Sequence, residues 1–257
     1  MKTLNKTLIA AAMLAGAGSA NASIAYDQSG SNEAYLAAYD ITTGKTFNFD
    51  TGVTYDNLVA NENNSAFSLN FDFSGDSNWT NFITGASLSS IKYVVAVGNT
   101  NVGAAITLDS PLTPNAEVNQ GIFFGADVAT AISAHAIDIN SKVIVNNAQN
   151  LSTLALDSES PGAGQFGEAT TVWNSWIQDP TASYGQSIGF QLGVLDQTDG
   201  HNIASTFAGK WQLAGNGLTF SAPAVAAVPL PAAVWLFGAG LMTMLRANRR
   251  PSMALAA

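Results

Sequence analysis

Residues 66–73 read Ala66-Phe67-Ser68-Leu69-Asn70-Phe71-Asp72-Phe73, and apolar and polar side chains alternate from Phe67 to Phe73. Successive side chains of a β-strand point to opposite faces, so the phenylalanines and the leucine share one face. The serine, asparagine and aspartate share the other face. A period of two over eight residues is typical of an antiparallel strand with one buried and one solvated face. This stretch therefore predicts a β-rich domain.

The segments on either side favour the same fold class. Strand-like patterns occur at residues 34–39, 45–50, 92–97, 104–109 and 187–195, and a hairpin is predicted from 211–213 and 218–220 around Asn216-Gly217. One segment differs, because apolar residues recur at helical spacing from Ala126 to Ile139. We therefore expect a mainly β domain over residues 23–220, a β-sandwich or jelly-roll-like fold with one helix.

The N-terminus has the three parts of a secretory signal peptide. Lys2 and Lys6 supply a positive start, residues 8–17 are apolar, and Ala20-Asn21-Ala22 is a small-residue cleavage site. We expect cleavage between Ala20-Asn21-Ala22 and Ser23, which removes residues 1–22. A first transmembrane helix is the alternative, but the apolar region is only about ten residues long.

The C-terminus carries a second sorting pattern. Val228-Pro229-Leu230-Pro231-Ala232 precedes an apolar run from Ala233 to Leu245, and Arg246, Arg249 and Arg250 close it. A helix over residues 232–245 would span about 21 Å, short for a hydrocarbon core of about 30 Å. The arginines would hold its end on the cytoplasmic side of the membrane. We therefore expect a short transmembrane helix, with a buried core helix as the alternative.

This pattern resembles the sorting signal of PEP-CTERM proteins, in the form written VPLPA. The resemblance covers about 25 residues and includes the motif, the apolar run and the arginines in the family's order. It implies a protein that is exported by a Gram-negative bacterium, processed by an exosortase and associated with exopolysaccharide or biofilm. Residues 221–227 would be a tether and 228–250 the sorting signal. Residues 251–257 form a tail longer than the family usually has.

The charge and composition of the chain limit the classes of molecule that it can bind. Between residues 23 and 227 lie all 18 acidic residues but only four lysines and no arginine, so this region carries 4 − 18 = −14. Nucleic acid is an unsuitable partner, because its phosphates need Lys or Arg. The chain has no cysteine, which excludes disulfides and thiol chemistry. Solubility, Ca²⁺ binding and contact with cationic polymers all fit an acidic surface.

The sequence offers little for catalysis, and we expect no enzyme activity and no catalytic cofactor. His135 and His201 are the only histidines, too few for a zinc site, and no nucleophile or phosphate-binding motif occurs. Asp196 and Asp199 lie in a turn-like segment that fails the EF-hand spacing. A looser Ca²⁺ site there, or at residues 72–76, is the alternative to a polar turn between strands.

Two tryptophans are the last candidates for binding a ligand, in this case a carbohydrate. Trp173 and Trp176 lie three residues apart, so they would share a helix face but point opposite ways in a strand. Burial in the core is the simpler interpretation for all the tryptophans of the domain. Two function classes follow. The first is a structural or adhesive protein, anchored at least transiently in the inner membrane and then at the cell surface, whose partners are the secretion machinery, an exosortase-type enzyme and exopolysaccharide. The alternative is a secreted carbohydrate- or Ca²⁺-binding module.

Overall fold

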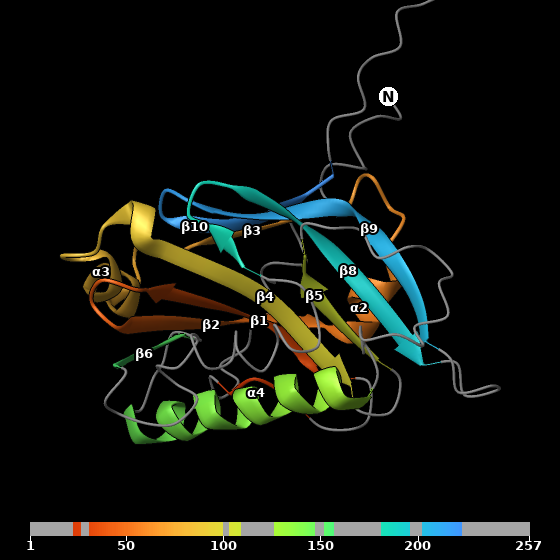
Figure 1. The fold of residues 1–257 in the computed structure, drawn as a ribbon, viewed down its shortest axis with the longest axis horizontal. Helices are drawn as coiled ribbons and strands as arrows, with labels where there is room; N and C mark the ends of the chain where they lie inside the picture. The colour runs from red at the N-terminus through yellow and green to blue at the C-terminus, as the bar shows by residue number, and fades with distance from the viewer. Residues whose placement is uncertain are drawn as a thin grey trace, which may run out of the picture. The chain divides into compact units, whose positions relative to one another are not determined.

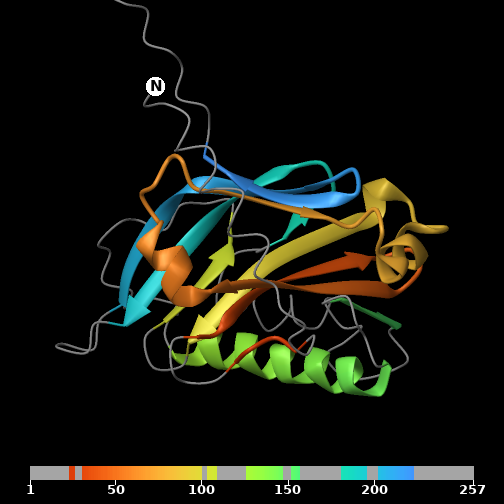
Figure 2. The ribbon, with the colours of Figure 1, turned by 180° about the vertical axis from the view of Figure 1, so that it is seen from behind.

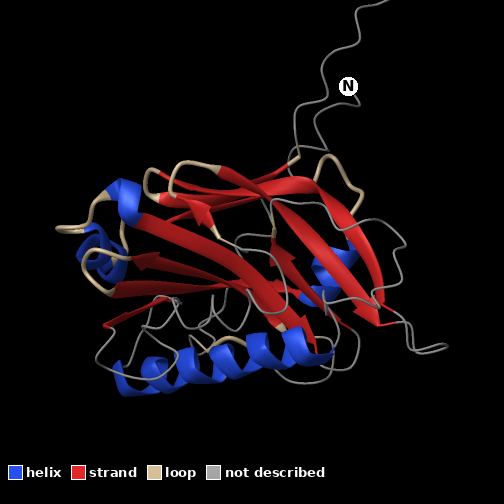
Figure 3. Cartoon of the chain, in the orientation of Figure 1, coloured by secondary structure: helices blue, strands red, loops and turns tan. Residues whose placement is uncertain are grey.

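The computed structural model describes residues 23–26, 31–99, 103–108, 126–146, 152–156, 181–195 and 202–222. The chain divides into two compact units, residues 1–223 and 224–257, and all the described residues belong to the first. Its strands form one antiparallel sheet that curls around an apolar core, with helices at its ends and on its outer side (Figures 1 and 3).

Within the described residues the sheet has ten strands. They are β1 (Glu33–Asp40), β2 (Lys45–Thr54), β3 (Ser68–Asp72), β4 (Ile91–Asn99), β5 (Gly103–Thr107), β6 (Ser152–Leu156), β7 (Ala182–Ser183), β8 (Ser187–Leu195), β9 (Asn202–Ala214) and β10 (Gly217–Ser221). The order is β3-β10-β9-β8-β5-β4-β1-β2-β6, and β7 pairs with β4. The helices are α2 (Tyr55–Ala60), α3 (Ser77–Ile83) and α4 (Ala126–Asn146), with a 3₁₀ turn at Leu88–Ser90.

The mainly β prediction is confirmed, and the described strands form one continuous curled antiparallel sheet. A sandwich or jelly roll needs two sheets, whereas the pairings β5–β8 and β1–β4 join all the described strands into one. Alternation shows which face of a strand is buried but not which strand lies beside it. The curl brings opposite ends of the sheet together, because Phe49 of β2 meets Phe71 of β3 with ring centroids 5.5 Å apart.

β1 and β4 lie in the middle of the sheet and are covered on both faces. Leu36, Tyr93 and Val95 belong to the inner core, whereas Tyr35 and Val94 belong to the cluster under α4. A strand buried on both sides needs apolar residues at every position, which explains the continuous runs of these two strands. β3 lies at the edge and keeps the alternation of its sequence, with Ser68, Asn70 and Asp72 exposed.

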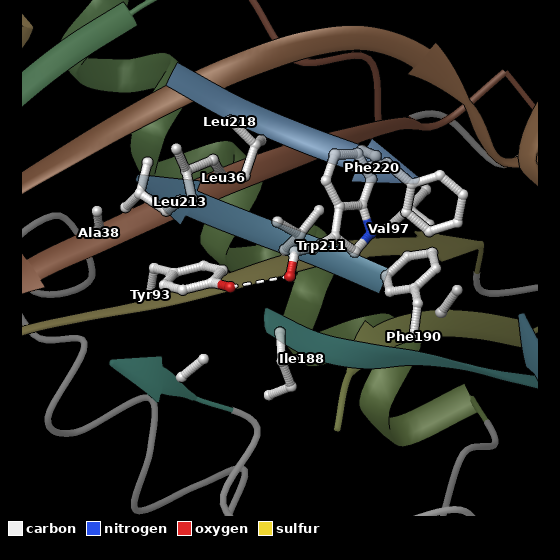
Figure 4. Close-up of a cluster of buried hydrophobic side chains, with 14 of the residues drawn as sticks. Leu36, Ala38, Tyr93, Val97, Ile188, Phe190, Trp211, Leu213, Leu218 and Phe220 are labelled. Atoms are coloured by element: carbon white, nitrogen blue, oxygen red, sulfur yellow. Dashed lines mark hydrogen bonds between the residues drawn. The ribbon is translucent and has the colours of Figure 1, made fainter. Parts of the chain in front are cut away.

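The inner core is the cluster that the curled sheet encloses, and aromatic rings dominate it. Its largest fully buried side chains are Trp79, Trp211, Tyr93, Phe47, Phe73, Phe82, Phe190 and Phe220. Figure 4 shows the part formed by β1, β4, β8, β9 and β10, where the Tyr93 hydroxyl donates to the Trp211 carbonyl at 3.1 Å. Large rings bury much apolar area each, so a chain without disulfides can hold its fold by packing.

α3 closes one end of the curled sheet. The Asp76 carboxylate caps it by accepting from the backbone N–H groups of Asn78 and Trp79. At the other end of the helix the Lys45 ammonium donates to the carbonyls of Asn81 and Thr84 at 2.8 and 3.0 Å. Both contacts satisfy backbone groups that a helix leaves unpaired at its ends.

The prediction of one helix is therefore wrong, since the described residues contain three. α2 and α3 have six and seven residues, too few to show a helical period in the sequence. Their caps, Thr54 and Asp76, are the available signals. The third helix, α4, is confirmed and runs seven residues past the predicted end at Ile139.

The predicted hairpin of β9 and β10 is confirmed, but its turn lies one residue earlier. Ala214 pairs with Gly217, so Gly215 and Asn216 form the turn, and Gly215 takes the positive φ of +58°. Gly217 instead starts β10, where a Cβ would lie 2.5 Å from the Phe71 carbonyl oxygen. Asn216 ties the turn to α3, because its side-chain oxygen accepts from the Trp79 indole at 3.2 Å.

α4 lies along the outer side of the sheet (Figures 1 and 2). Its buried residues Ala129, Ile132, Ala136 and Ile139 pack on β1, β4 and β5. We call the whole cluster the outer core; its other buried members are Ile24, Tyr35, Ala37, Val94, Ala96, Ala104, Ile106 and Leu108. The helix lies close to β4 at Gly98, where a Cβ would lie 2.7 Å from the Ala129 carbonyl oxygen. No helix among the described residues is long and apolar enough to cross a membrane, and the predicted span over residues 232–245 lies outside them.

We expect Gly98→Ala to destabilise the domain by roughly 1–3 kcal/mol, because the added methyl must push α4 away from β4. The neighbouring atoms are helix backbone and cannot rotate away. Urea denaturation of the purified protein measures the loss. Gly75→Ala is the matched control, since a Cβ there meets nothing within 4 Å. Equal stabilities of the two variants would contradict the close packing of α4.

Candidate functional site

Polar side chains gather on the outer side of β2, the side that faces α4. Thr46, Asn48 and Asp50 pair across the sheet with Tyr39, Ala37 and Tyr35, so they share the outer face with Tyr35 and Ala37 of the outer core. All three are buried. We call Thr46, Asn48 and Asp50 the polar row.

The polar row is incompletely satisfied by hydrogen bonds. Thr46 Oγ1 and Asn48 Oδ1 are buried and have no partner within the described part of the chain. The Asn48 amide donates to Thr153 Oγ1 of β6 at 3.4 Å. A buried polar group without a partner costs stability, so this face is not optimised for packing alone.

Asp50 is the most perturbed acid of the polar row. It is 4% exposed, and burial raises the pKa of its carboxyl to about 7. The N–H of Gly52 donates to its Oδ1 at 2.8 Å and lowers this pKa, whereas the charge of Glu33 raises it further. Burial has the largest effect, so the carboxyl is mostly neutral below pH 7.

His135 lies on the buried side of α4, opposite β1. Its Nδ1 is 3.1 Å from the Tyr35 hydroxyl, which also lies 3.3 Å from the Ile132 carbonyl oxygen. The histidine is buried at 6% exposure and its ring packs on Tyr35 with centroids 5.5 Å apart. These contacts give His135 a structural role between helix and sheet.

Near the polar row, the segment Ser23–Tyr26 is held against the body of the domain. The side-chain amide of Asn140 in α4 makes two hydrogen bonds to the backbone of Ile24. Its Oδ1 accepts from Ile24 N–H and its Nδ2 donates to Ile24 O, each at 2.8 Å. Glu33 does the same for Ala25, through its Oε2 and its own N–H, each at 2.8 Å. Figure 2 shows this red segment beside α4.

The apolar part of this contact is the Ile24 side chain. It is 2% exposed and belongs to the outer core with Ile132, Ala136 and Ile139 of α4. We call Glu33, Asn140 and this apolar surface the docking site of residues 23–26. It was not predicted, although Asn140 follows Ile132 and Ala136 at four-residue spacing. A polar residue on the buried stripe of a helix is a signal that could have found it.

The turn at residues 72–76 is one of the two candidate Ca²⁺ sites. Asp72 accepts from the N–H and the hydroxyl of Ser74, at 2.9 and 3.0 Å, and Asp76 caps α3. Both carboxylates thus have local partners typical of a polar turn. The described residues contain no group of three or more metal-ligating side chains.

We expect Asp76→Ala to cost about 1 kcal/mol of unfolding free energy, because α3 loses its N-cap, and Asp76→Asn to cost much less. Asparagine keeps the oxygen that accepts from Asn78 and Trp79. Thermal melts with and without Ca²⁺ measure both effects. Stabilisation of the wild type by Ca²⁺ that is lost in Asp76→Asn would contradict the purely structural role.

The tryptophans divide into two groups. Trp79 and Trp211 are 1% and 0% exposed and lie in the inner core, which confirms burial for these two. Trp173 and Trp176 lie outside the described residues, as do Asp196, Asp199 and His201. The ligand predictions for these residues stay predictions.

The residues of the two predicted sorting signals also lie outside the described part of the chain. They are Ala20 and Ala22 at the signal-peptide site, and Val228, Pro229, Leu230, Pro231, Ala232, Arg246, Arg249 and Arg250 at the C-terminus.

Comparisons with known proteins add no relative. No family model matches the chain, and the searches of curated proteins and of solved structures gave no significant match. The functional conclusion therefore rests on the residues of this chain.

Proposed function

We propose that this chain is an exported protein of the cell surface or extracellular matrix, sorted by its C-terminal signal. The observation that carries the proposal is the ordered pattern of Val228–Ala232, the apolar run 233–245 and the three arginines. The signal-peptide pattern at residues 1–22 supports it independently, because it directs the chain across the same membrane.

A structural or adhesive role is favoured over catalysis within this proposal. Asp72 and Asp76 are engaged in a turn and a helix cap, and His135 bridges to Tyr35. Asp50 has a shifted pKa but is buried at 4% exposure. The acidic charge of −14 between residues 23 and 227 suits a soluble surface in contact with polysaccharide. The expected partners are an exosortase-type enzyme, the secretion machinery and exopolysaccharide.

The test is to alter the sorting motif and follow the protein by cell fractionation. Pro229→Ala with Pro231→Ala removes the two residues that stop a helix from running through the motif. We expect the wild type outside the inner membrane and the double variant retained in it. Pro223→Ala is the matched control, because it changes a proline of the tether and leaves the motif intact.

Two outcomes would count against the proposal. Equal distribution of the wild type and the double variant would show that the motif does not sort the protein. Binding to a glycan array that depends on Ca²⁺ or is lost in Trp173→Ala would favour the carbohydrate- or Ca²⁺-binding alternative. Trp79 and Trp211 are buried, so among the four tryptophans of residues 23–220 Trp173 and Trp176 are the candidates for that role.

A further inference from the structure

Strand β3 has one edge that no other described strand covers. It lies at one end of the strand order and pairs with β10 alone among the described strands (Figure 1). Phe73, one residue past β3, donates its N–H to the carbonyl of Asn216 at 2.7 Å. Backbone groups alternate in direction along a strand, so those of Phe71 and Leu69 also face β10. The remaining residues of β3 direct their N–H and C=O groups away from β10, and they are Ser68, Asn70 and Asp72.

We call Ser68, Asn70 and Asp72 the open edge. Their side chains are exposed. Proteins usually protect such an edge with lysine, proline, a bulge or a covering element. β3 contains no lysine or proline, and its pairing with β10 has no register shift. The strand at the other end of the sheet, β6, is covered by α3, whose Asn78 amide donates to the Ser152 carbonyl at 3.1 Å.

Apolar side chains next to the open edge are only half-buried. Leu69 and Phe71 point to the inner core but stay partly exposed. The ring of Phe71 meets that of Phe49, which is also partly exposed, at 5.5 Å between centroids. A strand added beside β3 would pair the free backbone groups, and apolar residues on its inner side would cover this surface.

A second copy of β3 has the residues that such a strand needs. In antiparallel pairing with Asn70 opposite Asn70 of the second copy, Leu69 lies opposite Phe71 and Ser68 opposite Asp72. Residues opposite each other share a face of the sheet, so both apolar pairs lie on the inner side. Asp72, the single charge of β3, then meets a serine. Parallel pairing in register would instead place the two aspartates together, which is unfavourable.

We propose that two copies of this chain form a symmetric dimer by antiparallel pairing of their β3 edges about Asn70. A two-fold axis passes between the two asparagines, and the two sheets become one. The interface is small, because β3 has five residues, so we expect a weak dimer that depends on protein concentration. The pairing does not depend on the sorting signals of the proposed function, so either proposal can fail without the other.

Disulfide trapping on the full chain tests the dimer and its register. The chain has no cysteine, so one introduced cysteine reports on one position. Opposed residues of a hydrogen-bonded antiparallel pair have Cα atoms about 5.5 Å apart, which a disulfide can bridge. We expect Asn70→Cys to form a covalent dimer under mild oxidation, seen on a non-reducing gel.

Ser68→Cys is the matched control, because it is exposed on the same strand. In the proposed register its two copies are four residues out of step, roughly 13 Å apart, too far for a disulfide. We expect at least roughly fivefold more dimer from Asn70→Cys than from Ser68→Cys. Equal trapping of the two variants, or more trapping of Ser68→Cys, would overturn the proposal.

Charges placed at Ser68 test the same register in the Asn70→Cys chain. Ser68→Lys sets a lysine opposite Asp72 of the second copy, whereas Ser68→Asp sets two carboxylates opposite each other. We expect trapping to rise in the first variant and to fall in the second, each by roughly threefold to tenfold. Ser89→Lys and Ser89→Asp, at an exposed serine of the 3₁₀ turn, control for net charge. Effects at Ser68 that only match those at Ser89 would overturn the register.

Asn70→Pro tests the backbone contact without a cysteine. Proline is tolerated on an edge strand where its nitrogen faces solvent, so the pairing of β3 with β10 should persist. The dimer loses the two N–H donors nearest its axis. In sedimentation velocity at increasing protein concentration, we expect the wild type to rise above the mass of one chain and Asn70→Pro to rise far less. The same rise in both would overturn the proposal.

Discussion

Phe220→Ala is expected to lower the free energy of unfolding by roughly 3–5 kcal/mol, the usual cost of truncating a buried phenylalanine. Phe220 is 2% exposed on β10 and meets four other rings, those of Phe67, Phe190, Phe207 and Trp211, with centroids 4.9 to 6.3 Å apart. Figure 4 shows it beside Trp211 and Phe190. The surrounding rings are held by strands and cannot collapse fully into the space.

Gly209 makes this prediction more specific. A Cβ at Gly209 of β9 would overlap the Phe220 ring, so the glycine provides the surface on which the ring lies. We expect Gly209→Ala to be destabilising in the wild type but much less so in the presence of Phe220→Ala. The two changes should therefore be non-additive, as expected for residues in direct contact.

Urea denaturation of the wild type, the two single variants and the double variant measures both effects. Leu88→Ala is the control, because Leu88 is apolar but 50% exposed. If Phe220→Ala costs no more than Leu88→Ala, or if the costs of the two core changes simply add, the packing of the inner core is not as described.

Asp50→Asn is expected to stabilise the domain at alkaline pH and to have little effect at acid pH. Burial raises the pKa of Asp50 from 3.8 to about 7. Between these values the folded state holds a proton that the unfolded chain has released, so stability falls as pH rises. At about 1.4 kcal/mol per pH unit, the loss from Asp50 is roughly 4 kcal/mol by pH 8.

Asparagine does not ionise, and its side-chain oxygen can still accept from Gly52 N–H. The stability of Asp50→Asn should therefore exceed that of the wild type by roughly 3–4 kcal/mol at pH 8, with the difference vanishing near pH 4. Urea denaturation at several pH values measures it. Asp56→Asn, at an exposed carboxylate of α2, is the control. A difference that does not change with pH would contradict the burial of the Asp50 carboxyl.

Much of the sheet could be predicted from the sequence, because alternating apolar and polar residues indicate a strand with one buried face and one exposed face. Residues 68–72 kept the predicted exposed and half-buried faces, and 187–195 form β8 at the predicted bounds. The joining of the strands into one sheet could not be predicted, because it depends on pairings between distant segments such as β5 and β8. α2 and α3 were missed because short helices leave only their caps in the sequence.

The same holds for the candidate sites: contiguous patterns could be recognised in the sequence, whereas contacts between residues far apart in the chain could not. Sorting signals are contiguous, so their patterns can be recognised in residues 1–22 and 228–250, and both stay predictions. The docking site joins Ile24 to Asn140, 116 residues away, and no local pattern connects them. Asp50 has the position of a solvent-facing residue in an alternating strand, yet it is 4% exposed, and the local pattern of β2 does not show that its outer face is covered.

We propose that both ends of this chain are sorting signals that flank a domain acting outside the inner membrane. Cell fractionation followed by intact-mass measurement of the mature protein tests it most directly. We predict a chain that begins at Ser23, ends within or just after Val228–Ala232, and is found outside the inner membrane. Recovery of a chain in the inner membrane with Ala257 still at its end would contradict the account.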